Sequence, residues 1–227
     1  MIKAVIFDLD DVLFDEKEFA VQGFMAVAKY LATKHNLERR QVFRLLRNDF
    51  KRGVRKRNFD VLLDKTGLRG ERVSNLVRIY REHQPSLTLH PDAKGFLTRS
   101  KGTYKFGIIT DGPRNMQLNK ISSLGLRKYM DVVTINERKE DWKPNTRSFK
   151  VTLTKLQVKP REAIYVGDNP SKDFIGCKRI GLHTVRIRRG GGEYHDLLLD
   201  KRHEADRTIS NLRSLGKIIR EIDEKTS

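Results

Sequence analysis

The residues best suited to chemistry lie just after the apolar run from Ile2 to Phe7, where Asp8 and Asp10 stand two residues apart. In an extended chain the two carboxylates point the same way, and in a bent chain both can still converge on one site. Two anions this close repel each other unless a cation or a shared proton relieves the repulsion. An isolated Asp-x-Asp pair is usually a solvated acidic turn, so its meaning depends on the rest of the chain.

Two later segments offer groups that could hold an anion. Thr110 and Asp111 follow a second apolar run and precede a turn, which places a hydroxyl and backbone N–H groups at a strand-to-helix junction. Lys143 comes just before a helix that is predicted to begin near Asn145, and its ammonium group could neutralise a phosphate. Taken singly, Thr110 is an ordinary helix cap and Lys143 a solvated lysine, so these groups are informative only together with Asp8.

A fourth segment adds Asp168 and Asp173 after the run from Ala163 to Val166. Hard carboxylate oxygens of this kind suit Mg²⁺. One scheme unites the four segments: Asp8 attacks phosphorus, and Mg²⁺ relieves the crowding of the carboxylates and binds a phosphoryl oxygen. Asp10 protonates the leaving oxygen and later takes a proton from water, while the hydroxyl and the lysine hold the other oxygens.

The elements that must position these groups are predicted from the apolar pattern. Continuous apolar runs alternate with helical stretches near residues 114–123, 146–156 and 171–180, which is typical of parallel strands joined by crossover helices. Polar groups that follow such strands meet at one edge of the sheet. We therefore expect an α/β fold with a Rossmann-like doubly wound parallel sheet, whose strands are Ile2–Phe7, Tyr104–Ile109, Asp131–Ile135, Ala163–Val166 and Thr184–Ile187.

The stretch between the first two strands does not continue this alternation of apolar runs and helical stretches. Apolar residues recur at helical spacing in three places, within residues 24–31, 42–46 and 73–80. Pro85 and Pro91 discourage helix near its end. We expect residues 15–87 to form an all-helical cap subdomain, inserted into a core that consists of residues 1–14 and 88–227.

Composition and charge set further limits. A net charge of +18 and a pI near 10.1 are typical of proteins that bind nucleic acid or other polyanions, although a basic surface also attracts small phosphorylated substrates. The segment from Arg39 to Arg57 holds nine Lys and Arg residues. The single cysteine, Cys177, leaves no disulfide framework and no cysteine cluster for zinc. Because the chain shows neither a bilayer-spanning apolar run nor a signal peptide, we expect a cytoplasmic protein without a membrane partner.

The four segments match, in order and spacing, the four motifs of the haloacid dehalogenase (HAD) superfamily, and the chain resembles its phosphatase-like members. The helical insertion is similar to the C1-type cap of that superfamily. The resemblance implies that Asp8 is the nucleophile and Asp10 the general acid and base. The implied phosphate-binding residues are Thr110, Asp111 and Lys143. The implied metal ligands are Asp8, Asp168 and Asp173, together with Asp10 through its backbone carbonyl.

The motifs depart from the family pattern in two places. Asp11 stands where the family often has glycine, and Val12 stands where threonine is frequent. Asp111 stands where asparagine is common. Its backbone N–H can still bind phosphate, but we expect its negative side chain to point away from the phosphate.

The sequence thus predicts a Mg²⁺-dependent phosphatase that hydrolyses a small phosphate monoester through a phosphoaspartate. Asp10 argues against halide displacement, because the dehalogenases of the superfamily do not keep this second aspartate as an acid and base. Two alternatives stay open: a phosphomutase that uses the same four motifs, and a nucleic-acid-binding protein that has kept a phosphatase core. We expect a small phosphorylated substrate, nucleic acid as a less favoured partner, and a monomer or a homodimer.

Overall fold

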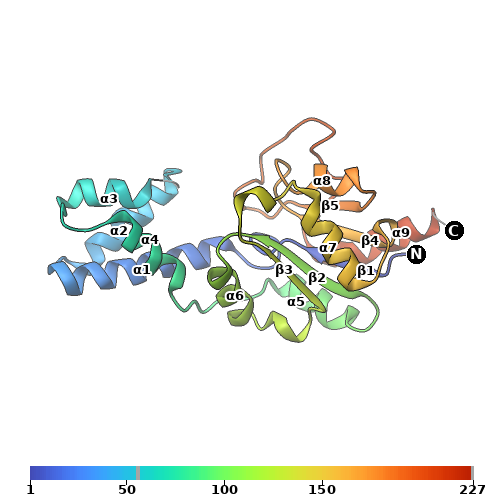
Figure 1. Cartoon of the computed structure of the whole chain (residues 1–227), viewed down its shortest axis with the longest axis horizontal. Coiled ribbons are helices and arrows are strands. Elements are labelled where there is room, and N and C mark those ends of the chain that lie inside the picture. The colour runs from blue at the N-terminus through green and yellow to red at the C-terminus, as the bar shows by residue number, and fades with distance from the viewer. Residues whose placement is uncertain (55–56, 226–227) are drawn as a thin grey trace. The chain divides into compact units, whose positions relative to one another are not determined.

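The chain folds into two compact units, one made of Met1–Asp15 with Thr88–Ser227 and the other of Glu16–Leu87. We call them the α/β unit and the helical unit. The computed structural model describes residues 1–54 and 57–225 (Figure 1). Arg55 and Lys56 of the basic segment therefore lie outside the described residues. Among the described residues, none of the helices combines the length and the apolar character that a membrane span requires.

The α/β unit is built on a six-stranded sheet in which every neighbouring pair of strands is parallel. The strand order is β3-β2-β1-β4-β5-β6, so the chain starts in the middle, runs outward to β3 and returns past β1 to form the other half. This is a doubly wound sheet, and the predicted fold class is confirmed. The strands are β1 (Ala4–Phe7), β2 (Lys105–Asp111), β3 (Val132–Asn136), β4 (Ala163–Gly167), β5 (His183–Ile187) and β6 (Arg207–Ile209).

Helices cover both faces of this sheet (Figure 1). Right-handed crossovers place the helices of the two halves on opposite faces, because the two halves grow in opposite directions from β1. On one face lie α5 (Pro91–Ser100) and α6 (Arg114–Ser123), and on the other α7 (Thr146–Leu156) and α8 (Phe174–Arg179). The last helix, α9 (Leu215–Glu224), follows β6.

Alternate strand residues fill the two layers of the core. Ile6 and Tyr165 belong to a buried cluster with Phe149 of α7 and Phe174 of α8, and the rings of Phe149 and Tyr165 meet edge-on with centroids 5.1 Å apart. On the opposite face, Phe7 packs edge-on against Phe96 of α5 at a centroid distance of 6.3 Å. Each fully buried aromatic side chain contributes about 2–3 kcal/mol of hydrophobic stabilisation, so the two layers hold the strand ends in a fixed register.

This register brings the motif residues to one edge of the sheet. Phe7 is aligned with Ile108 of β2 on one side and with Val166 of β4 on the other. β1 ends at Phe7, β4 one residue past Val166 and β2 three residues past Ile108, so the motif residues at and just after these ends share the carboxyl edge of the sheet, where open α/β sheets bind ligands.

The helical unit consists of α1 (Glu16–His35), α2 (Arg39–Lys51), α3 (Asn58–Thr66) and α4 (Val73–Glu82). The helices share a buried apolar core to which α1 contributes Phe24 and Leu31, α2 Leu46, α3 Leu62 and α4 Leu76. Because this core is separate from those of the sheet, the unit is stabilised largely by its own packing.

One buried carboxylate, in the loop before α4, connects α1 with α4. The side chain of Glu71 is only 2% exposed and accepts hydrogen bonds from Tyr30, Lys34, His35 and Asn75 at 2.7–3.0 Å. Burial alone would raise the pKa of Glu71, but hydrogen bonds from His35, Asn75, Lys34 and Tyr30 outweigh it and hold that pKa far below the ordinary value of 4.5.

Candidate active site

Asp8 directly follows β1, and its carboxylate is buried and hydrogen-bonded. One carboxylate oxygen accepts the N–H of Leu9 at 2.8 Å, and the other lies 2.7 Å from Nζ of Lys143. Burial by itself raises the pKa of the Asp8 carboxyl, but Lys143 and Lys172 outweigh it and lower that pKa. Asp8 is therefore an ionised carboxylate, as a nucleophile must be.

Lys143 stands between two carboxylates with its side chain fully buried. Its ammonium group lies 2.7 Å from Asp8 and 2.9 Å from Asp173, and it donates to the hydroxyl of Tyr165 at 2.9 Å. Burial disfavours the charged amine, but attraction to Asp173 and Asp8 outweighs it and raises the pKa of Lys143. A permanent cation is thus fixed beside Asp8, where it could contact an oxygen of a bound phosphoryl group.

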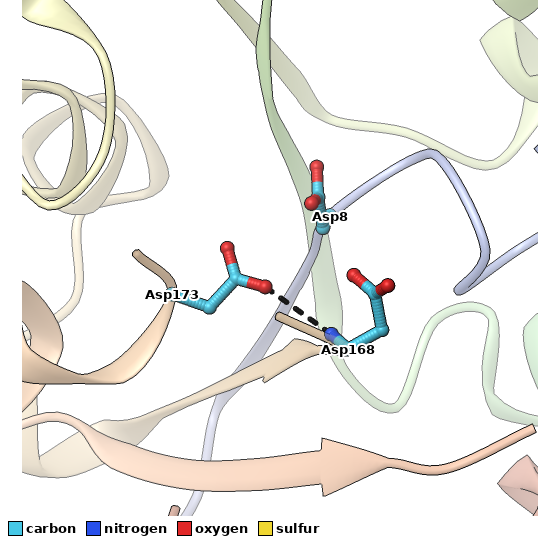
Figure 2. A group of neighbouring side chains, drawn as sticks. All are labelled: Asp8, Asp168 and Asp173. Carbon is cyan, nitrogen blue, oxygen red and sulfur yellow. Dashed lines mark hydrogen bonds between the residues drawn. The ribbon is translucent and has the colours of Figure 1, made fainter. Parts of the chain in front are cut away.

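Asp8, Asp168 and Asp173 form a buried carboxylate cluster, with one oxygen of each within 4.8 Å of the others (Figure 2). Asp173 is held by the backbone N–H groups of Asp168 and Asn169, at 3.2 and 2.9 Å. Its approach depends on Gly167 at the end of β4, since a Cβ there would lie 2.5 Å from an Asp173 oxygen. The cluster therefore rests on a strand end that only glycine can form without displacement of Asp173.

The chemistry of this donor set fits a hard divalent cation. Burial and the neighbouring carboxylates Asp173 and Asp8 raise the pKa of Asp168 well above its usual range, because they disfavour its charged form. Carboxylate oxygens are the ligands that Mg²⁺ prefers, and a cation among them removes the repulsion. Asp8, Asp168 and Asp173 could therefore hold Mg²⁺.

Thr110 and Asp111 lie at the end of β2, on the neighbouring strand. Thr110 is buried, and its hydroxyl oxygen has no hydrogen-bond partner among the described residues. A buried hydroxyl left unpaired is costly, so Thr110 suits a ligand that supplies the missing partner, such as a phosphoryl oxygen.

The Asp111 carboxylate is bound on two sides. One oxygen accepts from Nδ2 of Asn136 at 2.8 Å and from the backbone N–H of Lys143 at 3.3 Å, and the other lies 3.5 Å from Nζ of Lys172. The negative charge that is unusual for the family at this position is thus compensated locally by a lysine.

The side chain of Asp10 pairs with a lysine of α6. Its carboxylate binds Nζ of Lys120 on α6 at 2.7 Å, and the lysine side chain is 1% exposed. The Asp10 carboxyl is 22% exposed, so it is open to solvent as a group that exchanges protons requires. The structure thus brings Asp8 and Asp173 into direct contact with Lys143 and places an Asp168 oxygen within 4.8 Å of theirs, while Lys120 holds the Asp10 side chain.

The turn after β1 is held by a segment that follows β5, more than 170 residues later in the sequence. Asp11 has a φ of +53°, in the left-handed region, which accounts for the glycine that the family often has there; aspartate tolerates this region better than most residues. Its carboxylate accepts the N–H of Glu193 at 3.2 Å. Arg189 donates to the carbonyl of Val12 at 2.8 and 3.0 Å and pairs with Asp92.

Three residues of this site escaped sequence reasoning. Lys120 looked like one more helical lysine, because its contact with Asp10 spans 110 positions of sequence. Tyr165 looked like a core residue of its strand, and Lys172 stands inside the last motif without a role in the family pattern. The excess of positive residues was the available signal, but it did not distinguish these two lysines from the many that are solvated.

Comparison with known proteins places the chain in a family. It matches the sequence profile of haloacid dehalogenase-like hydrolases over residues 5–187. A glyceraldehyde 3-phosphate phosphatase of Methanopyrus kandleri is 31% identical over 234 residues, which cover 98% of this chain and 99% of the relative. The structure of a HAD phosphatase from Thermococcus onnurineus has a TM-score of 0.63 and 29% identity, covering 96% of this chain and 98% of that one. A 2-haloacid dehalogenase of Pseudomonas syringae, with a TM-score of 0.64, 22% identity and coverage of 97% and 99%, shares the fold.

The chain therefore belongs to the haloacid dehalogenase-like hydrolases. The prediction of a phosphatase-like member of this superfamily, a phosphoric monoester hydrolase, is confirmed.

Proposed function

We propose that this protein is a Mg²⁺-dependent phosphatase that hydrolyses a small phosphate monoester through a phosphoaspartate on Asp8. The observation that carries the proposal is the position of Asp8, buried and ionised between the ammonium group of Lys143 and the carboxylates of Asp168 and Asp173. This arrangement supports the proposal, because it would put a nucleophile, a fixed cation and a set of metal ligands around one point.

We assign substrate binding to groups at the end of β2 and in the loop before α7. The hydroxyl of Thr110 and the backbone N–H of Asp111 would hold phosphoryl oxygens, and Lys143 would contact a third. The side chains of Asp8, Asp168 and Asp173 and the carbonyl of Asp10 would hold Mg²⁺. When bound, Mg²⁺ would polarise a phosphoryl oxygen and offset the negative charge that gathers at this edge of the sheet.

The reaction then needs two proton transfers by one residue. Asp8 attacks phosphorus, the bond between phosphorus and the leaving oxygen breaks, and Asp10 gives its proton to that oxygen. The Asp10 carboxylate next takes a proton from a water molecule, which attacks phosphorus and releases Asp8 and inorganic phosphate. Lys120 would keep the Asp10 carboxyl in place through both steps.

The substrate class follows from the relatives and the site together. The relative from Methanopyrus kandleri is a glyceraldehyde 3-phosphate phosphatase, so a short phosphorylated aldehyde, sugar or acid is the first class to test. We propose that the helical unit acts as a cap that selects among such substrates. That the protein is cytoplasmic, and a monomer or a homodimer, stays a prediction.

A screen for phosphate release tests this function. Sugar phosphates, nucleotides, small phosphorylated acids and glyceraldehyde 3-phosphate are each incubated with Mg²⁺ or with excess chelator, with Asp8→Asn as the control. The proposal requires Mg²⁺-dependent release of inorganic phosphate that Asp8→Asn abolishes. Full activity in chelator would contradict it, and conversion to an isomeric ester without free phosphate would favour a phosphomutase.

Metal binding itself separates the roles of two ligands. Asp173 is already engaged by Lys143 and by two backbone N–H groups, and we expect Asp168→Ala to weaken Mg²⁺ binding more than Asp173→Ala. Titration calorimetry with Mg²⁺ alone measures this without reference to activity. Equal affinity of wild type and Asp168→Ala would remove Asp168 from the metal site.

A further inference from the structure

One face of α2 carries only positive side chains. Val42 and Leu46 turn into the core of the helical unit. At 100° per residue, four exposed cations fall within a narrow stripe on the opposite side of the helix. They follow the spacing i, i+4, i+7 and i+11 and are Arg40, Arg44, Arg47 and Lys51. We call this stripe the basic face of α2.

The acidic residues on and next to α2 do not neutralise this face. Glu38 caps the helix by accepting the N–H groups of Arg40 and Gln41 at 2.9 and 2.6 Å. Asp49 is buried and bound by Lys65 at 2.8 and 2.9 Å. Among the described residues of the helical unit, the ion pairs involve other cations. The basic face therefore keeps its full charge.

This charge works against the stability of the helix. Like charges three and four positions apart repel, and the basic face contains three such contacts in succession. The whole helical unit has 17 Lys and Arg residues against eight Asp and Glu residues, so its wider field adds to the repulsion. Folding gains nothing from this arrangement, whereas a polyanionic partner would turn the repulsion into attraction.

We propose that the basic face of α2 binds the phosphodiester backbone of nucleic acid. At a rise of about 1.5 Å per residue, the four cations are about 4.5–6 Å apart and extend over about 16 Å, which suits a row of successive phosphates. Three of the four are arginines, whose planar guanidinium groups bind phosphate through paired hydrogen bonds. Contacts of this kind do not read bases, so binding should be independent of sequence.

Two other polyanions fit this face less well. Membrane-surface helices insert an exposed apolar side, but the apolar residues of α2 are buried or half-buried, and none of the exposed large apolar residues of the described chain lies on α2. Protein interfaces have a central patch of apolar or aromatic anchors, and the basic face lacks one. Phosphate contacts alone suffice for sequence-independent binding of nucleic acid.

Fluorescence anisotropy at several salt concentrations tests the proposal. The probes are a labelled 20-nucleotide RNA, the matching single-stranded DNA and its duplex. The variant is the fourfold R40Q/R44Q/R47Q/K51Q. Its matched control, R99Q/R127Q/K155Q/R161Q, removes four exposed cations from the α/β unit. Thermal melting establishes that both variants are folded, and the double variant R44Q/R47Q replaces the fourfold one if needed.

The salt dependence gives the expected size of the effect. Each phosphate contact contributes about −0.7 to the slope of log K against log salt for single strands and about −0.9 for B-form DNA. The fourfold variant should therefore lose about three units of slope, or about half of that in the double variant, while the control keeps the slope of the wild type. RNA and single-stranded DNA should behave alike, and the duplex should show the somewhat larger loss.

Three results would overturn the proposal. The first is an unchanged affinity and slope in the fourfold or double variant, and the second is an equal loss in the control. The third is displacement of the RNA by polyglutamate or by phosphatidylserine vesicles at equal charge concentration, which would assign the face to an acidic protein or to a membrane surface. Because binding is measured without turnover, failure here leaves the proposed phosphatase function untouched.

Discussion

Lys120 and Asp10 form an ion pair in which the lysine is buried and the aspartate is open to solvent. We expect Lys120→Met to lower kcat by up to about 10²-fold with little change in KM, because general acid and base help is lost when Asp10 swings free. The loss should be larger for esters with poor leaving groups, which need protonation most. Lys120→Arg should recover part of the rate by restoring the ion pair.

A merely structural role for Lys120 would give a different pattern. If Lys120 acts through Asp10, the double variant Asp10→Asn/Lys120→Met should be no slower than Asp10→Asn alone. Additive losses, or a loss of the same size for good and poor leaving groups, would contradict the assignment.

Asp111 and Lys172 offer a second test at the scale of single residues, since their side chains lie 3.5 Å apart beside the proposed phosphate site. Lys172→Gln leaves the Asp111 carboxylate uncompensated, and we expect inorganic phosphate to bind about tenfold more weakly, equivalent to about 1.4 kcal/mol. Adding Asp111→Asn should restore most of the affinity. Inhibition by phosphate measures both effects, and a second substitution that restores nothing would show that the two residues are independent.

At the scale of elements, much of the α/β unit could be predicted. The helices α6 and α7 run from Arg114 to Ser123 and from Thr146 to Leu156, which are the stretches that the sequence predicts. Pro113 and Asn145 mark their starts, and Asn145 caps α7 by accepting the N–H of Arg147 at 2.9 Å. Such start signals can be recognised from the sequence because they are adjacent to the helix that they begin.

Elements without such signals were missed. The strand β6 has three residues, two of them exposed, so it is too short to show an apolar pattern that predicts a strand. The short helix α3 follows the basic segment directly, and its start, Arg57, makes no side-chain cap. The same limit applies to the site: the motif residues follow strands and were identified, but Lys120 depends on which side of α6 faces Asp10, which only packing decides.

Glu71 shows how one buried carboxylate can connect two helices of the helical unit, α1 and α4. Its pKa lies far below 4.5 in the folded chain, so its contribution to stability is complete above the unfolded pKa and is lost as the pH falls from about 4.5 toward the folded value. We expect Glu71→Gln to lower the free energy of unfolding by about 1–3 kcal/mol at pH 7. The difference from wild type should shrink steadily below pH 4.5.

Denaturant unfolding at several pH values measures this. The matched control is Glu82→Gln, because Glu82 is 55% exposed and pairs with Arg78 one turn away. Its effect should stay within about 0.5 kcal/mol at every pH. A Glu71→Gln difference that is the same at pH 7 and pH 3 would show that the carboxylate charge does not stabilise the unit.

At the scale of the whole molecule, the two proposed activities lie on different units. The α/β unit holds every residue assigned to phosphoryl transfer, and the helical unit holds the basic face of α2 and a separate apolar core. The net charge of +18 belongs to both, and favours anionic substrates at the sheet edge as well as polyanions on the helices. Catalysis and nucleic-acid binding can therefore be tested by separate sets of variants.

The central claim is that phosphate passes through a covalent bond to Asp8. It is tested most directly by rapid acid quenching of the enzyme with a ³²P-labelled aryl phosphate and Mg²⁺, followed by peptide mapping. Asp10→Asn should accumulate label on the peptide that contains residue 8, approaching one equivalent per chain, because the phosphoaspartate forms with a good leaving group but is hydrolysed slowly. The label should be released by hydroxylamine and be absent in Asp8→Asn. Turnover by Asp8→Asn, or label on another residue, would contradict the account.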